Sequence, residues 1–187
     1  NDKTIDKQSD NETKKIKPVM IGKLEIPSLG SIGVETSLNK KMGLNLWSDF
    51  TANDAIKYLN LLPNKISSRV YQKFLNEVYA STSEPPKGNS DEISKFLETR
   101  LVKLALNGQT DYLIKIISQL PDSPKWERWK EWYVIHHFLV KDDTNACLKI
   151  SNTIMNYDSI FWKKANLLCL ILQRNLSEAN FIYDVMR

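Results

Sequence analysis

The sequence predicts an all-α protein: a right-handed array of antiparallel helical hairpins, similar to a tetratricopeptide solenoid, that follows an extended N-terminal arm. Two observations predict this fold class. From residue 48 onward, apolar residues recur at helical spacing in runs that short breaks separate. In the second half of the chain, one local pattern occurs three times. It is a hydroxyl residue at a helix start, then a small polar or acidic residue, then a core-facing residue.

The three copies of this pattern define a period. They are Thr110-Asp111-Tyr112, Thr144-Asn145-Ala146 and Ser177-Glu178-Ala179. Their core-facing positions recur at roughly 33–34 residues, which is the period of stacked helical hairpins. The full tetratricopeptide consensus is absent, because the first helices lack a Trp-Leu-Gly-Tyr run. The likeness therefore rests on period and topology.

The first 47 residues have no helical period. Residues 1–17 contain only two large apolar side chains, Ile5 and Ile16, which predicts a disordered tail. Glycine and proline punctuate residues 18–47, which predicts an extended arm along the helices rather than a small sheet. We expect the end of the arm to be pinned by a group of apolar residues: Met42, Leu44, Leu46 and Trp47.

The helical part divides into four predicted hairpins, at about 48–82, 90–120, 123–156 and 158–187. Hydroxyl residues at the starts can cap the helices, while Pro63, Pro121 and the stretch 84–88 end them. The breaks are short, so consecutive helices should be antiparallel neighbours. An array needs a polar terminal cap, and residues 181–186 are too apolar for one. We therefore expect more chain to follow in the natural protein.

Composition argues against several classes of partner. The net charge of +4 is modest, and no run of five or six basic residues marks a nucleic-acid site. The longest nearly continuous apolar run, residues 165–172, is too short to cross a bilayer. The partner we expect is a protein, and we expect no nucleic acid.

No pattern in the chain points to catalysis. His136 and His137 are adjacent, so on a helix they diverge by about 100° and cannot chelate one metal ion. The chain has no Gly-x-Ser-x-Gly nucleophile motif, no Cys-x-x-Cys and no phosphate-binding loop. The sequence therefore predicts no catalytic residue, no metal ligand and no cofactor.

One stretch is unusually aromatic. Trp126, Trp129 and Trp132 lie at helical spacing around Arg128. The tryptophans fill the space between hairpins in one interpretation. In the other, these four residues line a groove and anchor a partner, because Trp and Arg dominate binding hot spots. In the second case, Trp129→Ala would weaken a partner without unfolding the domain.

The two cysteines, Cys147 and Cys169, fall on neighbouring predicted helices at similar heights. A disulfide is geometrically possible and would indicate an oxidising compartment. The alternative is two small thiols buried in a helix interface.

Several short stretches resemble a family of uncharacterised exported helical-repeat proteins of α-proteobacteria. The most specific is the Gly-Leu-x-x-Trp stretch at 43–47. Others are Ile32-Gly33-Val34, Leu61-Leu62-Pro63, the run 80–86, and the hairpin around Trp162, Cys169 and Ala179. The resemblance spans residues 18–187, although this chain is richer in Lys, Ile and Asn. It implies a helical-repeat fold, export to the periplasm, and a longer natural chain. Export would favour the disulfide, and the cytoplasm is the alternative location.

These observations favour a non-catalytic scaffold or adaptor of the cell envelope that binds a protein through a helical-repeat groove. The alternative is the helical superstructure of a larger cell-wall enzyme, such as a lytic transglycosylase, with its catalytic domain beyond residue 187. An RNA-binding array is disfavoured, because Glu and Lys alternate around residues 125–131.

Overall fold

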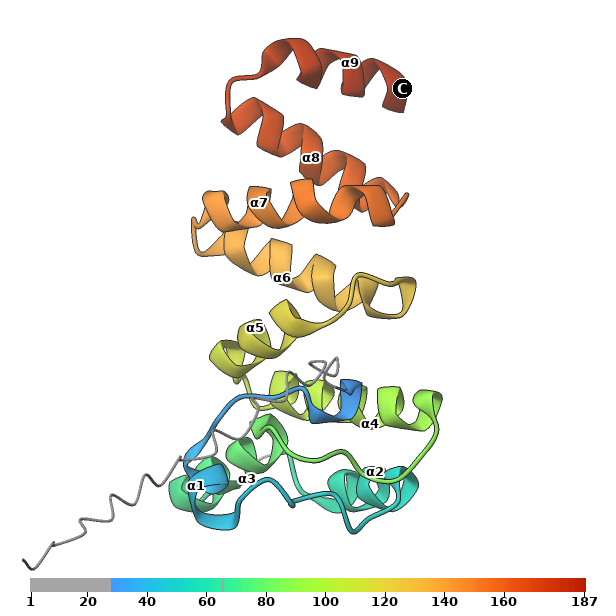
Figure 1. Cartoon of the computed structure of the whole chain (residues 1–187). Helices are drawn as coiled ribbons and strands as arrows, with labels where there is room; N and C mark the ends of the chain where they lie inside the picture. The colour runs from blue at the N-terminus through green and yellow to red at the C-terminus, as the bar shows by residue number, and fades with distance from the viewer. Residues whose placement is uncertain (1–27, 65) are drawn as a thin grey trace, which may run out of the picture.

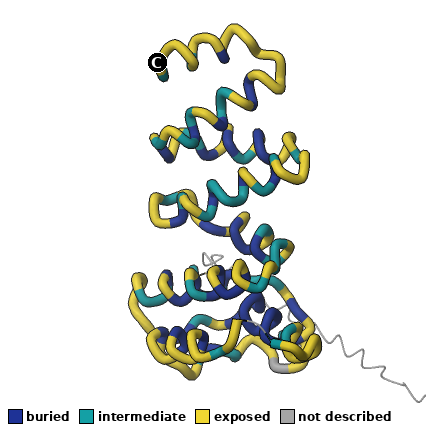
Figure 2. The backbone as a smooth tube through the Cα atoms, turned by 180° about the vertical axis from the view of Figure 1, so that it is seen from behind, coloured by how far each residue is buried: buried dark blue, intermediate teal, exposed yellow. Residues whose placement is uncertain are grey.

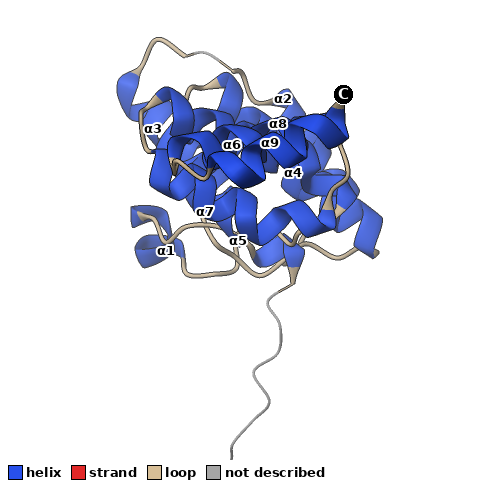
Figure 3. Cartoon of the chain, turned by 90° about the horizontal axis from the view of Figure 1, so that it is seen from above, coloured by secondary structure: helices blue, strands red, loops and turns tan. Residues whose placement is uncertain are grey.

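The computed structural model describes residues 28–64 and 66–187, and its regular secondary structure there is helical, without strands (Figure 3). The elements are η1 (Leu29–Ser31), α1 (Ser37–Met42), α2 (Ala52–Leu61), α3 (Arg69–Ala80), α4 (Ser90–Leu106), α5 (Thr110–Gln119), η2 (Pro124–Trp126), α6 (Glu127–Leu139), α7 (Asp143–Thr153), η3 (Ile154–Asn156), α8 (Ile160–Leu172) and α9 (Leu176–Met186). The all-α class is thus confirmed. The predicted tail 1–17 and the first part of the arm, 18–27, lie outside the described residues.

From α4 to α9 the helices follow one another along the stack in Figure 1. The α4–α5, α6–α7 and α8–α9 turns lie on one side, and the α5–α6 and α7–α8 connections lie on the other. The pairs α6–α7 and α8–α9 pack as hairpins. The first predicted hairpin is different, because α2 packs chiefly on α4 rather than on α3. Both α2 and α3 pack on the long helix α4.

The arm contains a helix that the sequence pattern did not predict. The side chains and backbones of Thr36 and Asn39 form a capping box at the start of α1. Upstream, the backbone of Val34 pairs with α3 and the residues after it, accepting from Thr82 and donating to Ala80. Gly33 is required there, since a Cβ would lie 2.5 Å from the Thr82 nitrogen.

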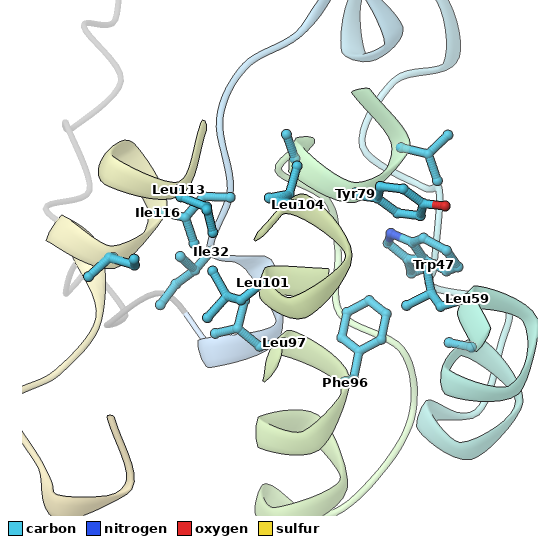
Figure 4. Packing of buried hydrophobic residues seen from close by; sticks show 14 of the residues in the cluster. Ile32, Trp47, Leu59, Tyr79, Phe96, Leu97, Leu101, Leu104, Leu113 and Ile116 are labelled. Carbon is cyan, nitrogen blue, oxygen red and sulfur yellow. The ribbon is translucent and has the colours of Figure 1, made fainter. Parts of the chain in front are cut away.

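The structure confirms only some of the residues that were predicted to hold the end of the arm against the helices. Trp47 is buried, and Leu46 packs against the core. Leu44 is 51% exposed, so its prediction was wrong. The side chain of Met42 lies outside what the structure describes. Trp47 instead meets the edge of Phe96 on α4, with ring centroids 5.3 Å apart (Figure 4).

Arg100 on α4 joins the arm to the helices. Its side chain is fully buried, and its guanidinium donates to three carbonyl oxygens. The acceptors are Tyr79 at 2.8 Å, Ser81 at 2.6 Å and Ile32 at 2.9 Å. Two of these carbonyls end α3, whose own backbone leaves them unpaired. Burial lowers the pKa of Arg100 to about 10, so it remains charged at neutral pH.

Two buried lysines serve other helix ends in the same way. Lys103 donates to the Leu62 carbonyl after α2, at 2.8 Å. Lys130 on α6 donates to the carbonyls of Ile117 and Leu120 at the end of α5, at 3.1 and 2.6 Å. A cation at a helix C-terminus is favourable, because the last carbonyls carry partial negative charge. Three helix ends are therefore fixed by cations from the helices packed on them.

The three hairpin turns share one backbone geometry. Gly108, Lys141 and Arg174, which recur at a constant interval along the chain, have φ values of 64°, 62° and 60°. After each, the next residue donates its N–H to a carbonyl five positions earlier: Gln109 to Leu104, Asp142 to His137 and Asn175 to Leu170. Helices α6 and α8 have 13 residues each, and α7 and α9 have 11 each. The pairs α6–α7 and α8–α9 can therefore be aligned residue by residue, and the turn after α4, a helix of 17 residues, aligns the pair α4–α5 with them.

This alignment corrects the predicted pattern. The N-cap positions are Gln109, Asp142 and Asn175, and the hydroxyl residues lie inside the first turns. The residue equivalent to Ala146 and Ala179 is Leu113 rather than Tyr112, so the two intervals are equal. Of the three N-cap residues only Asp142 caps with its side chain, which accepts from the Asn145 N–H, so the hydroxyl residues did not mark the helix starts.

A disulfide joins Cys147 on α7 to Cys169 on α8, with 5.5 Å between their Cα atoms. Of the two interpretations that the sequence left open, the structure contains the cross-link. It lies in a small apolar cluster that is separate from the larger core near α4, and Val134, Ile150 and Trp162 belong to the same cluster.

We expect Arg100→Met to lower the free energy of unfolding by about 3–5 kcal/mol, because three buried carbonyls lose their donor. Urea unfolding monitored by circular dichroism measures this. The matched control is Arg69→Met, an exposed arginine on α3, which should change stability by less than about 0.5 kcal/mol. A loss below about 1 kcal/mol for Arg100→Met would show that the arm is held by its other contacts.

We expect loss of the disulfide to cost about 3 kcal/mol, since the bond closes a loop with a sequence separation of 22. The test compares urea unfolding of the natural protein, with and without reductant, and of the double variant Cys147→Ser, Cys169→Ser. Reductant should destabilise only the natural protein. Equal stability in all samples would contradict the expectation.

Candidate functional site

A groove between α4 and α6 brings together three of the four predicted contact residues. Its volume is about 350 Å³. From α6 come Arg128, Trp129 and Trp132. The opposite wall is α4, which contributes Glu98, Val102, Ala105 and Leu106. The groove thus has an apolar wall, an aromatic wall and one charge of each sign.

Trp126, the fourth predicted residue, does not reach this groove. It ends the short helix η2, its side chain is 1% exposed, and it belongs to the main core. The prediction that Trp126 contacts a partner is therefore wrong. The first turn after Ser123-Pro124 is 3₁₀ rather than α-helical, which departs from the α-helical spacing used to align Trp126 with the other tryptophans.

The two tryptophans of the groove have a double role. Trp129 and Trp132 are partly buried and pack against the core. Trp132 also stacks on His136, with ring centroids 5.4 Å apart and an interplanar angle of 12°. Trp129 occupies the position that Phe96 and Trp162 occupy in the neighbouring hairpins, where both are fully buried. Trp129→Ala would consequently disturb packing as well as any contact.

Charged groups at the groove are available to a ligand. Arg128 and Glu98 are exposed, and neither forms an ion pair within the described part of the chain. Glu131, one turn further along α6, has its pKa raised by burial and by the negative charge of Glu127. The site can offer a cation and an anion beside apolar surface.

Lys130 joins the N-terminal half of α6 to the end of α5. Besides its two carbonyl acceptors, its ammonium pairs with Asp122 at 3.2 Å. Asp122 also pairs with Lys149 of α7 at 3.1 Å. Burial lowers the pKa of Lys130 to about 8, and the positive charge of Lys149 adds to this effect. Burial alone would raise the pKa of Asp122, but hydrogen bonds and charges from the two lysines lower it.

The histidine that the sequence offered as a possible functional residue has a structural role. The His137 ring bonds to Asp142 at 2.8 Å, and Asp142 caps α7, so this pair holds the α6–α7 turn. Among residues 28–64 and 66–187, no group of histidine, cysteine and carboxylate side chains could hold a metal ion. None of the helices in this part of the chain is long and apolar enough to span a membrane.

Sequence reasoning missed the aliphatic wall of the groove. Val102 is 42% exposed and Leu106 is 54% exposed, although both lie on a helix with a well-defined buried stripe. The available signal was their position: they lie outside the face that carries Phe96, Leu97 and Leu104. Apolar residues off the buried face of a helix mark surface that another element can cover.

The free energy of unfolding should rise with pH because of Lys130. Its pKa falls from 10.5 to about 8 on folding, so the unfolded state binds more protons between these values. The difference in stability between the natural protein and Lys130→Met should increase from pH 8 to 10.5, by up to about 1.4 kcal/mol per pH unit. Paired urea titrations across this range measure it. A flat or falling difference would contradict a lowered pKa.

Comparisons of the chain with protein-family models, with curated proteins and with solved structures find no match. The resemblance to exported helical-repeat proteins of α-proteobacteria therefore stays a prediction. What the structure establishes is an all-α fold of the described residues in which hairpins pack along a stack.

Proposed function

We propose that the protein is a non-catalytic scaffold or adaptor that binds a segment of another protein in the groove between α4 and α6. The observation that carries this is the meeting of Val102 and Leu106 with Trp129, Trp132 and Arg128 in one hollow. Aromatic and arginine side chains around an apolar floor are the composition of binding hot spots.

The architecture behind this proposal is a right-handed tetratricopeptide-like solenoid. Support comes from the constant spacing of the turns at Gly108, Lys141 and Arg174. Stacked hairpins present the first helix of each pair on one face, and such arrays use that extended face for binding. Helices α4 and α6 are the first helices of their pairs, which places the groove on this face.

The groove favours a partner segment of a particular chemistry. An aliphatic or aromatic side chain would fill the space between Val102 and Trp132. An acidic group beside it would pair with Arg128, whose guanidinium can bind a carboxylate in bidentate fashion. Glu98 would disfavour a second acidic group at the α4 wall.

We place the protein in the periplasm. The Cys147–Cys169 disulfide supports this, because such bonds persist in oxidising compartments. The resemblance to an exported family agrees with it. Mass spectrometry after thiol alkylation of protein from the native host tests the location: alkylation of both cysteines without prior reduction would favour the cytoplasm.

Panning a phage library of random linear peptides against the whole chain tests the binding function. Selected peptides should combine large apolar residues with an acidic residue. Val102→Glu should weaken their binding at least tenfold by placing a charge in the apolar groove. Arg128→Ala should weaken acidic peptides most.

The control is Val70→Glu on α3, which puts the same charge at an exposed aliphatic position away from the groove. It should bind the peptides as the natural protein does. Peptides that bind Val102→Glu unchanged would show that the groove is not their site.

A further inference from the structure

A second cavity lies between α3 and the start of α5, and its volume is about 330 Å³. Helix α3 contributes Arg69, Lys73 and Asn76 to its lining, and the start of α5 contributes Gln109 and Tyr112. None of these residues lines the groove between α4 and α6. The cavity is therefore a candidate site that the proposed function does not use.

A chain of hydrogen-bonded amide side chains fixes one wall of this cavity. Gln72 accepts from the backbone N–H of Ile66 at 3.3 Å. Its amide nitrogen donates to the side-chain oxygens of Asn76 at 3.1 Å and of Asn107 at 2.8 Å. The amide nitrogen of Asn107 donates to the Lys103 carbonyl at 2.7 Å. Because a backbone donor begins this chain and a backbone acceptor ends it, the orientation of each amide is determined.

The fixed orientation leaves the N–H donors of Asn76 for the cavity. The side-chain oxygen of Asn76 is bonded to Gln72, whereas its amide nitrogen has no hydrogen-bond partner in the described part of the chain. The residue is only 6% exposed, and it lines the cavity. A buried N–H group without an acceptor is unfavourable. A ligand that accepts hydrogen bonds would satisfy it.

Positive charge accompanies this amide. Arg69 and Lys73 lie on the same helix at helical spacing from it, both are exposed, and neither forms an ion pair among residues 28–64 and 66–187. Gln109 begins α5 without a side-chain cap, so the positive end of that helix is left for a ligand. Hydrogen-bond donors and positive charges together favour an anion.

Negative groups nearby limit the charge that this anion can carry. Burial raises the pKa of the Tyr112 hydroxyl, and the negative charges of Glu77 and Asp111 raise it further, so the hydroxyl stays a neutral donor. The same two carboxylates offset the charges of Arg69 and Lys73. An anion with one negative charge therefore meets less repulsion here than a phosphate dianion.

We infer that this cavity binds a carboxylate that carries a short apolar group. The guanidinium of Arg69 binds the carboxylate in bidentate fashion, and Asn76 donates to one of its oxygens. The apolar group contacts Ile66, which is partly buried against the core, and the ring of Tyr112. Two sources share this chemistry: a short free carboxylic acid and the C-terminal residue of a peptide.

Heteronuclear NMR of the isotope-labelled whole chain tests the site directly. The side-chain NH₂ signals of Asn76, identified by their loss in Asn76→Asp, should shift on titration with butyrate or with the peptide acetyl-Ala-Val. The same peptide with an amidated C-terminus should leave them unchanged, because it lacks the negative charge. Butyrate that binds at least as tightly as the peptide acid indicates a free acid. A peptide acid that binds about tenfold tighter than butyrate indicates a peptide C-terminus.

Variants measured by ligand-observed NMR test the role of each group. Asn76→Asp keeps the oxygen that accepts from Gln72 and replaces the N–H donors with a second acceptor, so it should weaken carboxylate binding about tenfold or more. Arg69→Gln, at an exposed position, should weaken binding about fivefold or more with an unchanged circular dichroism spectrum. The control is Arg128→Gln, which removes an arginine from the other groove and should bind the carboxylate as the natural protein does.

Three results would each overturn the inference. The first is an absence of shifts in the Asn76 signals up to about 20 mM of either carboxylate. The second is inorganic phosphate that binds more tightly than both carboxylates. The third is natural affinity for the carboxylate in both Asn76→Asp and Arg69→Gln.

Discussion

The structure depends on one buried cation. The guanidinium of Arg100 has no carboxylate partner in the described part of the chain, and its three acceptors are backbone carbonyls of the arm and of the end of α3. Each of these carbonyls would otherwise be buried without a donor, at a cost of about 1–3 kcal/mol. The arm, α3 and α4 are therefore fixed relative to each other by one side chain. Every later helix is stacked on the platform that they form (Figure 1).

Buried cations that bind carbonyls at helix ends occur on α4 and α6 but not on α8. Lys130 is buried against the end of α5, whereas its equivalent in the next hairpin, Lys163, is half-exposed and pairs with the exposed Asp158. The α7–α8 junction therefore lacks an equivalent buried cation, and it carries the Cys147–Cys169 bond instead. The last helix, α9, has a single buried residue, Ala179, and is exposed along nearly all its length (Figure 2). Burial thus declines towards the end of the stack, while the candidate groove lies between the more deeply buried helices α4 and α6.

Helical periodicity and capping residues were enough to predict the helices after residue 48 and their spacing. They were not enough for the contacts that position them. Arg100 interrupts an apolar face between Leu97 and Leu101, and a charge in such a place carries no sequence signal for the carbonyls it meets. Those carbonyls are 19 to 68 residues away. Trp126 was wrongly assigned to the groove for the same reason. The spacing of apolar residues predicts the face of a helix on which a residue lies, but its burial depends on which neighbouring element covers that face. Helix α1 is six residues long, too short to show a period.

The common turn has a consequence for how this chain can vary in length. Each hairpin closes with a residue near φ 60°, which glycine adopts freely at 108 and which Lys141 and Arg174 adopt at some cost. Because the turn recurs at one fixed interval, adding or removing that length of chain would keep the remaining turns in register. Insertions of any other size would break that register. The length of this half of the chain can therefore change only in whole steps of the turn interval if the turns are to stay aligned.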